Sequence, residues 1–299
     1  MKYELPPIGT GMMQQWLRRI DPELLLPELS ESGVEFIEMY LAEENWEDRE
    51  RWLRLAREAD LFFTFHAPYV NRYDITLFKD IPGNEVRKAF TGVMELAAEL
   101  LSEYGLRSRL NLHGATDLIT ADRAFLYDIT VKFLNWLAGE REKRKWPLDF
   151  VIELLPHNGE KLKIGERAGD LVALQHEIGG EISGFCWDFG HYRSNVYQQW
   201  DASLPEEFLS RVRHAHIHDF KSLIMDVDHC PLIFGEVPYR SYLSRLGAED
   251  LFLVLELNYR NSESCGDPKE GLMTSIRELV SAREEIFSAL PENSPSKRR

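Results

Sequence analysis

Eight short apolar runs recur along the chain and alternate with longer segments of helical period. Such runs, rich in β-branched and aromatic residues, predict strands, and the alternation predicts repeated βα units. The predicted strands are 7–12, 34–40, 61–67, 109–114, 149–155, 182–188, 213–219 and 251–257, and the predicted helices are 46–59, 84–104, 121–140, 168–178, 205–212, 239–247 and 268–290. Eight strands in 299 residues indicate an α/β fold, the (β/α)8 TIM barrel. A doubly wound open sheet is the alternative.

The length and composition are compatible with one large domain. The chain is 44% hydrophobic and 28% charged, which is enough apolar sequence for a single barrel-sized core. No linker interrupts the βα pattern, and the last residues, PENSPSKRR, have the composition of a disordered terminus. We therefore expect a single domain over 1–290 and a disordered tail over 291–299.

Charge and cysteine usage narrow the class of protein. The formal net charge of −15 argues against nucleic acid as a partner, because nucleic-acid binders usually present a basic face. Cys186, Cys230 and Cys265 show neither metal-knuckle nor disulfide spacing, which favours a reducing compartment. No signal peptide or membrane span is evident, so a cytoplasmic protein that does not contact a membrane is expected. Nucleotide-binding and serine-nucleophile motifs are also absent from the sequence.

Residues that can bind a metal stand at the ends of seven predicted strands. They are Glu38, His66, His113, Glu153, Asp188, His216 and Glu256. In a (β/α)8 barrel the active site lies where strands end, so these side chains would share one mouth. Each one alone has an ordinary structural explanation, but several buried carboxylates together require a compensating cation. The mixed His, Asp and Glu set suits Zn, Mn, Co or Mg.

The stretch GFCWDFGH, residues 184–191, combines a strand with the start of a loop. We interpret Asp188 as a metal ligand and Gly190 as the residue that lets the chain turn, so that His191 faces the same cavity. Four further titratable residues are predicted to lie on the surface, away from the barrel mouth: His157, Glu160, Glu166 and His176.

Six motifs at the expected strand ends resemble the xylose isomerase-like barrel superfamily. They are HAPY (66–69), LHG (112–114), VIEL (151–154), WDFGH (187–191), HIHD (216–219) and LVLEL (253–257). This superfamily contains sugar and sugar-phosphate isomerases and epimerases together with endonuclease IV. The resemblance implies one divalent metal ion held by Glu153, Asp188, His216 and Glu256. Asp219 sets the register that selects His216; His218 shares its strand face, and His214 lies deeper and is expected to be structural.

The endonuclease branch implies additional ligands and up to three zinc ions. Its extra histidines would correspond to His66, His113 and His191, and its last pair to Asp226 or Asp228 with His229. The sequence departs from that pattern because Asp228 and His229 are adjacent, whereas the family separates them by one residue. It also has Leu154 and Leu155 where both branches usually place an Asn.

The resemblance implies a metal-dependent sugar or sugar-phosphate isomerase or epimerase, with Glu153 and Glu256 as base and acid. His66 and His191 would bind sugar hydroxyls, Tyr69 or Trp187 would stack on the sugar, and Glu38 would contact substrate. A phosphate pocket in this fold often uses backbone N–H groups of late loops, and the segment 234–239 lies in a suitable place but carries no decisive residue.

A multinuclear phosphodiesterase related to endonuclease IV is the alternative, with a non-catalytic binding barrel as a third hypothesis. The expected partner is a small carbohydrate, and the sequence leaves a homo-oligomer open.

Overall fold

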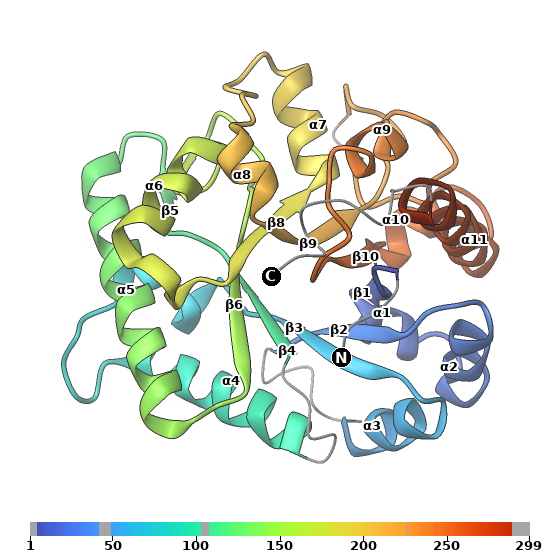
Figure 1. Cartoon of the computed structure of the whole chain (residues 1–299), viewed down its shortest axis with the longest axis horizontal. Helices are drawn as coiled ribbons and strands as arrows, with labels where there is room; N and C mark the ends of the chain where they lie inside the picture. The colour runs from blue at the N-terminus through green and yellow to red at the C-terminus, as the bar shows by residue number, and fades with distance from the viewer. Residues whose placement is uncertain (1–4, 42–48, 103–107, 226, 289–299) are drawn as a thin grey trace.

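Eight parallel strands close into a barrel that is surrounded by helices (Figure 1), which confirms the predicted fold class. The computed structural model describes residues 5–41, 49–102, 108–225 and 227–288. Around the barrel the strands follow the order β1, β10, β9, β8, β6, β4, β3, β2, and β2 pairs with β1. They are β1 (Ile8–Gly11), β2 (Phe36–Tyr40), β3 (Phe62–His66), β4 (Ser108–Leu112), β6 (Leu148–Glu153), β8 (Gly184–Asp188), β9 (Val212–Ile217) and β10 (Phe252–Glu256).

Each predicted helix overlaps a helix of the structure. These are α3 (Arg49–Glu58), α4 (Glu85–Ser102), α5 (Arg123–Arg144), α6 (Ala168–Ile178), α8 (Glu206–Ser210), α9 (Tyr239–Leu243) and α11 (Pro268–Ser288). Within the described ranges none of the helices is long and apolar enough to cross a membrane. The predicted tail 291–299 lies outside the described residues, and the domain extent 1–290 stays a prediction.

Further helices and a small second sheet escaped the sequence analysis, most of them short or starting directly at a strand. The exception is the ten-residue helix Pro22–Glu31. The helices are α1 (Met13–Leu17), α2 (Pro22–Glu31), α7 (Phe189–Tyr197) and α10 (Tyr259–Glu263), with short 3-10 turns η2 (Asn71–Tyr73), η3 (Ile75–Leu77) and η4 (Gly179–Glu181). The second sheet pairs β5 (Thr116–Leu118) antiparallel with β7 (Lys161–Lys163).

The end of the barrel at which the strands begin is closed by aromatic side chains. Phe36 stacks on Phe62, and Phe252 packs against both rings. Gly9 makes room for this layer, because a Cβ there would lie 2.3 Å from the ring of Phe36. The buried guanidinium of Arg109 covers Phe252 at 4.0 Å. This packed floor restricts access to the barrel interior to the opposite end.

Strand register brings the polar residues to that opposite end. Asp188 on β8 is in register with His216 on β9, and His216 is in register with Val254 on β10. Successive strand residues face opposite sides of a sheet, so Asp188 faces the interior while Trp187 faces the surrounding helices. The sequence therefore places its carboxylates and imidazoles inside the mouth of the barrel.

Candidate active site

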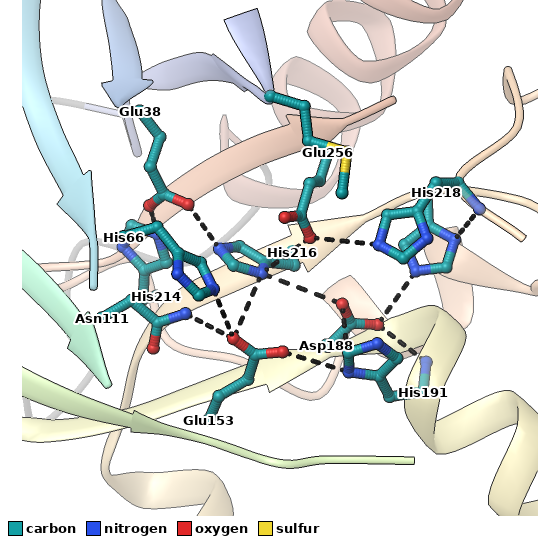
Figure 2. A network of polar contacts seen from close by, with 12 residues as sticks. Glu38, His66, Asn111, Glu153, Asp188, His191, His214, His216, His218 and Glu256 are labelled. Atoms are coloured by element: carbon teal, nitrogen blue, oxygen red, sulfur yellow. Dashed lines mark hydrogen bonds and ion pairs between the residues drawn. The ribbon is translucent and has the colours of Figure 1, made fainter. Parts of the chain in front are cut away.

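Four side chains from four strands converge on one point at the barrel mouth (Figure 2). The Nδ1 atom of His216 lies 3.0 Å from Glu256 Oε2, 3.7 Å from Glu153 Oε2 and 3.8 Å from Asp188 Oδ2. All four residues are buried, and Glu256 is the most exposed at 6%. The structure thus brings together the four residues that the sequence analysis selected as ligands of a single metal ion.

Asp188 has two oxygen atoms in different roles. Oδ1 accepts a hydrogen bond from the backbone N–H of His191 at 2.7 Å, which caps α7, and lies 3.2 Å from His218 Nε2. Oδ2 is buried and has no hydrogen-bond partner among the described residues. The helix cap therefore fixes the carboxylate and leaves Oδ2 directed at the convergence point.

Glu38 lies beneath His216 and joins it to His214. Its Oε1 is 2.9 Å from His216 Nε2, and its Oε2 is 2.7 Å from His214 Nε2. Burial alone would raise the pKa of Glu38, but His216 and His214 outweigh burial and hold the pKa far below its usual range. A proton on His216 Nε2 directs the lone pair of Nδ1 toward the mouth, which is how carboxylates orient metal-binding imidazoles.

Glu38 reaches the cavity at the barrel mouth with very little of its surface, so the expected contact with substrate stays a prediction. The residue is 1% exposed, and both carboxylate oxygens are engaged by imidazoles. The period-two alternation correctly placed Glu38 on the interior face of the barrel. It could not show how deep in the barrel the side chain lies. Its place below His216 suits orientation of that ring.

The donor set fits a divalent cation. Ligand atoms bound at about 2.1 Å to one ion lie roughly 3.0–3.5 Å apart, close to the separations around His216 Nδ1. Burial opposes ionisation of Glu153 and Glu256, but neighbouring histidines outweigh it and lower the pKa of both carboxyls well below 4.5. Three carboxylates and one imidazole without any thiolate suit Mn, Co, Zn or Mg.

A second group of donors adjoins Glu153. His66 Nε2 and His113 Nε2 lie 3.4 Å and 3.2 Å from its Oε2 atom, and the side-chain amide of Asn111 also donates to that oxygen. Burial lowers the pKa of His113. The nearby carboxylate of Glu153 raises that pKa but offsets burial only in part, so the ring favours the neutral form that binds metals. Asn111 was missed, although it stands two residues before His113 on the same strand face.

A third group of donors, which includes Asp188, lies on the other side of the mouth. It consists of Asp188, His191, His218 and His229, whose ligand atoms lie within 4.8 Å of one another. His229 Nδ1 pairs with Asp228 at 3.0 Å, although these two residues are adjacent in sequence. Asp226, the other candidate for that pair, lies outside the described residues. The structure thus gathers the predicted additional ligands that it describes around the central group.

A cavity of about 410 Å³ opens above these residues. It is lined by Met12, Gln14, Gln15, Glu38, Tyr40, His66, Tyr69, His113, Glu153, His191, His229 and Glu256. Tyr69 stacks on His113 with ring centroids 4.3 Å apart, and it is 50% exposed. Tyr40 could have been identified because it shares a strand face with Glu38, whereas Gln14 and Gln15 belong to the unpredicted helix α1.

Trp187 does not line this cavity. It is fully buried and packs outside the barrel against Phe189, Tyr192 and Tyr242. Since Asp188 faces inward, the residue before it must face outward. The expectation that Trp187 stacks on a sugar is therefore wrong.

Gly190 has a different role from the one expected. It does not occur among the residues with positive φ, so the chain needs no glycine there for a turn. A Cβ at this position would lie 1.9 Å from His218 Cε1. The glycine is required by close packing against the imidazole.

Two of the four residues expected on the surface are not there. Glu166 is fully buried, 3.0 Å from Arg123 and 3.2 Å from His157 Nδ1. His157 stacks on Trp200 at 3.6 Å. Glu160 and His176 are exposed as predicted. No short-range pattern marks Glu166, because its partner Arg123 is 43 residues away.

Comparison with known proteins agrees with this architecture. The sequence model of the family described as xylose isomerase-like TIM barrel matches residues 26–282. No curated protein sequence matches the chain.

Solved structures with the same fold include enzymes of different activities. A D-allulose 3-epimerase from Methylomonas sp., solved with D-allulose, superposes with a TM-score of 0.68 at 14% identity, covering 94% of this chain and 98% of its own. An L-ribulose 3-epimerase gives 0.62 at 13% identity, covering 97% and 100%. An AP endonuclease of family 2 from Brucella melitensis also gives 0.62 at 13%, covering 90% and 97%. Identities this low establish the shared fold.

Proposed function

The chain belongs to the xylose isomerase-like TIM barrel family, and we propose that it is a metal-dependent isomerase or epimerase of a sugar or sugar phosphate. The proposal rests mainly on the position of two carboxylates. Glu153 on β6 and Glu256 on β10 both approach His216 Nδ1, at 3.7 Å and 3.0 Å, within the cavity of about 410 Å³. Similarity to sugar epimerases of known structure supports the same class.

Glu153, Asp188, His216 and Glu256 would hold a divalent cation. Once bound, such an ion polarises the carbonyl of a hydroxy-ketone and makes the neighbouring C–H more acidic. Every other requirement of the reaction falls on the chain itself, which must orient the sugar and move a proton.

Proton transfer is assigned to the two glutamates. One carboxylate removes the proton from the carbon next to the carbonyl, and the other returns a proton to the opposite face of the same carbon. The low pKa of both groups keeps the base ionised at neutral pH. The other glutamate relays a proton from cavity water to the carbon during delivery, and the base gives up the proton it has removed to water at the end of the turnover, so that charge and protons balance.

Substrate orientation is assigned to the side chains around the cavity. His66 and His191 stand beside Glu153, with His191 Nδ1 3.1 Å from its Oε1 atom. Tyr69 offers an exposed ring for the apolar face of a sugar. The exposed ring takes the stacking role that the buried Trp187 cannot perform.

Deuterium exchange tests the proposal directly. The protein is incubated in deuterated water with Mn or Co and a panel of ketopentoses, ketohexoses and their phosphates, and NMR follows label entering the carbon beside the carbonyl. Glu256→Gln is expected to slow exchange by at least about 100-fold, because a neutral amide is not a base. Glu160→Gln, an exposed position outside the cavity, is the control and should exchange at the wild-type rate. Lack of exchange with every sugar would contradict the proposal.

A phosphoester hydrolase is a second candidate because donor groups flank the central one on both sides. One flanking group, formed by His66 and His113, shares Glu153 with the central group. The other, formed by His191, His218 and His229, shares Asp188 with the central group. Three ions in a row can activate water and stabilise a displacement at phosphorus. Against this, Lys and Arg are absent from the described residues that line the cavity. About three tightly held ions per chain, with cleavage of a phosphodiester, would favour the hydrolase.

A further inference from the structure

A second cavity of about 340 Å³ adjoins the first at the barrel mouth. The two share Tyr69, His113 and His191 in their walls. Among the described residues, the first cavity is lined by carboxylates and imidazoles without Lys or Arg, whereas the second contains Lys161 and Lys163. A molecule held beside the glutamates could therefore extend past these shared residues into a cationic compartment.

The position of both lysines follows from the small second sheet. They stand two residues apart on β7, so they occupy one face of the strand, while Leu162 between them packs against the hydrophobic core. On the neighbouring strand β5, Thr116 is in register with Lys163 and adds a hydroxyl to the cavity wall. The ammonium of Lys163 also donates to the carbonyl of Pro156, which fixes it at the edge of the cavity.

The wall that carries the lysines is held in place by buried polar groups. The side-chain amide of Asn195 donates to the carbonyls of Leu155 and Glu166, and its oxygen accepts from the N–H of His157 at 2.7 Å. The carboxylate of Glu166 in turn pairs with Arg123. These contacts pre-organise the cavity before any ligand arrives, which reduces the entropy lost on binding.

The place where the sequence analysis expected a phosphate is already occupied. In the segment 234–239, the N–H groups of Phe234 and Gly235 donate to Asp219 Oδ2 at 3.0 Å and 2.7 Å. The N–H of Val237 donates to the Oδ1 atom at 3.0 Å. A carboxylate of the chain itself thus fills this anion-binding loop, which corrects the expectation for 234–239.

Charge around the second cavity also favours an anion. Its one acidic lining residue among those described is Asp74, whose Oδ1 accepts from both the N–H and the hydroxyl of Thr76. Asn71 and Asn158 add polar groups without charge. In a chain of net charge −15, two lysines beside an acidic mouth make a local site for negative charge.

We propose that the second cavity binds an anionic group, a phosphate or a carboxylate, carried by the end of the substrate that is remote from Glu153 and Glu256. Lys161 and Lys163 hold this group, and Thr116 contributes a hydrogen bond. The inference rests on the proposed isomerase function, since it assigns the substrate class of that same site. It places the reacting carbons beside the glutamates and the charge beyond His113 and His191.

Binding of unreactive analogues tests the site separately from turnover. Calorimetry compares a hexitol with its terminal phosphate and with the corresponding sugar acid, in protein loaded with Mn; none of them has a ketone to react. One anionic analogue should bind about 10-fold more tightly than the hexitol, with the preference shrinking as salt rises. The phosphate and sugar-acid arms distinguish the two sources of negative charge.

Variants then locate the effect. Lys161→Gln/Lys163→Gln should abolish the preference for the anion while leaving hexitol affinity unchanged. Lys132→Gln/Lys143→Gln, a matched loss of two exposed lysines on α5, should keep it. Equal affinity of the hexitol and both anions, or a preference that survives loss of Lys161 and Lys163, would overturn the site. Lysine-dependent anion binding without deuterium exchange in any ketose would instead count against the isomerase function alone.

Discussion

Gly190 and His218 lie in van der Waals contact in a way that only glycine permits. A Cβ at position 190 would be 1.9 Å from His218 Cε1 and 2.3 Å from Nε2. The imidazole sits in this space with Nε2 3.2 Å from Asp188 Oδ1, while its Nδ1 accepts from the N–H of His229 at 3.0 Å. Because Nδ1 is an acceptor, a neutral ring carries its proton on Nε2 and donates it to Asp188. Gly190 thereby allows His218 to orient the carboxylate.

Gly190→Ala should displace His218 and disturb Asp188 without altering a polar group. We expect a loss of about 1–3 kcal/mol in the free energy of unfolding, the usual cost of overpacking a core. Gly169→Ala is the matched control, because Gly169 is likewise the second residue of its helix and a Cβ there would meet no atom within 4 Å. The control should gain up to about 1 kcal/mol from better helix propensity. Urea unfolding of the two variants checks this, and equal effects would contradict the role of close packing.

His218→Leu removes the imidazole beside Asp188 and leaves the His229 N–H without its acceptor, while Asp188 keeps the hydrogen bond from the His191 N–H. We expect a loss of about 2–4 kcal/mol in stability and weaker metal binding, because buried groups lose their partners. His218→Gln offers a donor and an acceptor at similar positions and should recover part of both losses. Calorimetric titration with Mn measures the affinity. If Gln proved no better than Leu, the ring would act by its shape and not by hydrogen bonding.

Metal binding should stabilise the protein and depend on the central four residues. At a free Mn concentration of about 100 times the dissociation constant, stability should rise by about 2.7 kcal/mol. Asp188→Asn and Glu153→Gln should abolish this increase, because each removes an anionic ligand from the buried group. Glu58→Gln, at an exposed ion pair on α3, should retain it. Thermal unfolding with and without Mn, supported by elemental analysis, decides between these outcomes.

The stability of metal-free protein should fall as pH rises above neutrality. Burial alone lowers the pKa of His216, but Cys186 and Glu256 outweigh it and hold the pKa well above 6.5. Asp228 and Glu256 likewise outweigh burial and raise the pKa of His229 well above 6.5. A group whose pKa is raised by folding stabilises fully below its unfolded pKa. That stabilisation is lost as pH rises through the folded value.

The carboxylates act in the opposite direction. The pKa values of Glu153 and Glu256 lie well below 4.5 despite burial, so their stabilisation is present above pH 4.5 and disappears as pH falls through the folded values. The contribution of these four groups is therefore greatest between about pH 4.5 and 6.5. Burial lowers the pKa values of His113 and His214, which places the stability maximum of metal-free protein toward the upper end of this window. Saturation with Mn should move the maximum upward, since imidazoles must lose their protons to bind a metal. Urea midpoints across pH test this, and an unchanged maximum in Mn would contradict it.

Sequence periodicity anticipated the barrel and most of its mouth. Asp188 and His216 were identified because each follows a short apolar run, where a parallel strand must end. The same alternation could have shown that Trp187 faces outward and that Asn111 faces inward with His113. Helix α7 was missed because it begins at Phe189, directly after the strand, and its cap is the proposed ligand Asp188 itself.

The sequence by itself determined the order of strands and helices and which residues face the barrel interior, because both depend on local periods of two and 3.6 residues. The tertiary structure alone decided which of those residues meet. Glu38 contacts His216 and Gly190 contacts His218 only because the sheet closes on itself and fixes a register between distant strands. The lysine cavity beside the mouth likewise depends on the pairing of β5 with β7, two strands that lie far apart in the sequence. Such contacts are set by barrel closure and by pairing between distant segments, which no local pattern records.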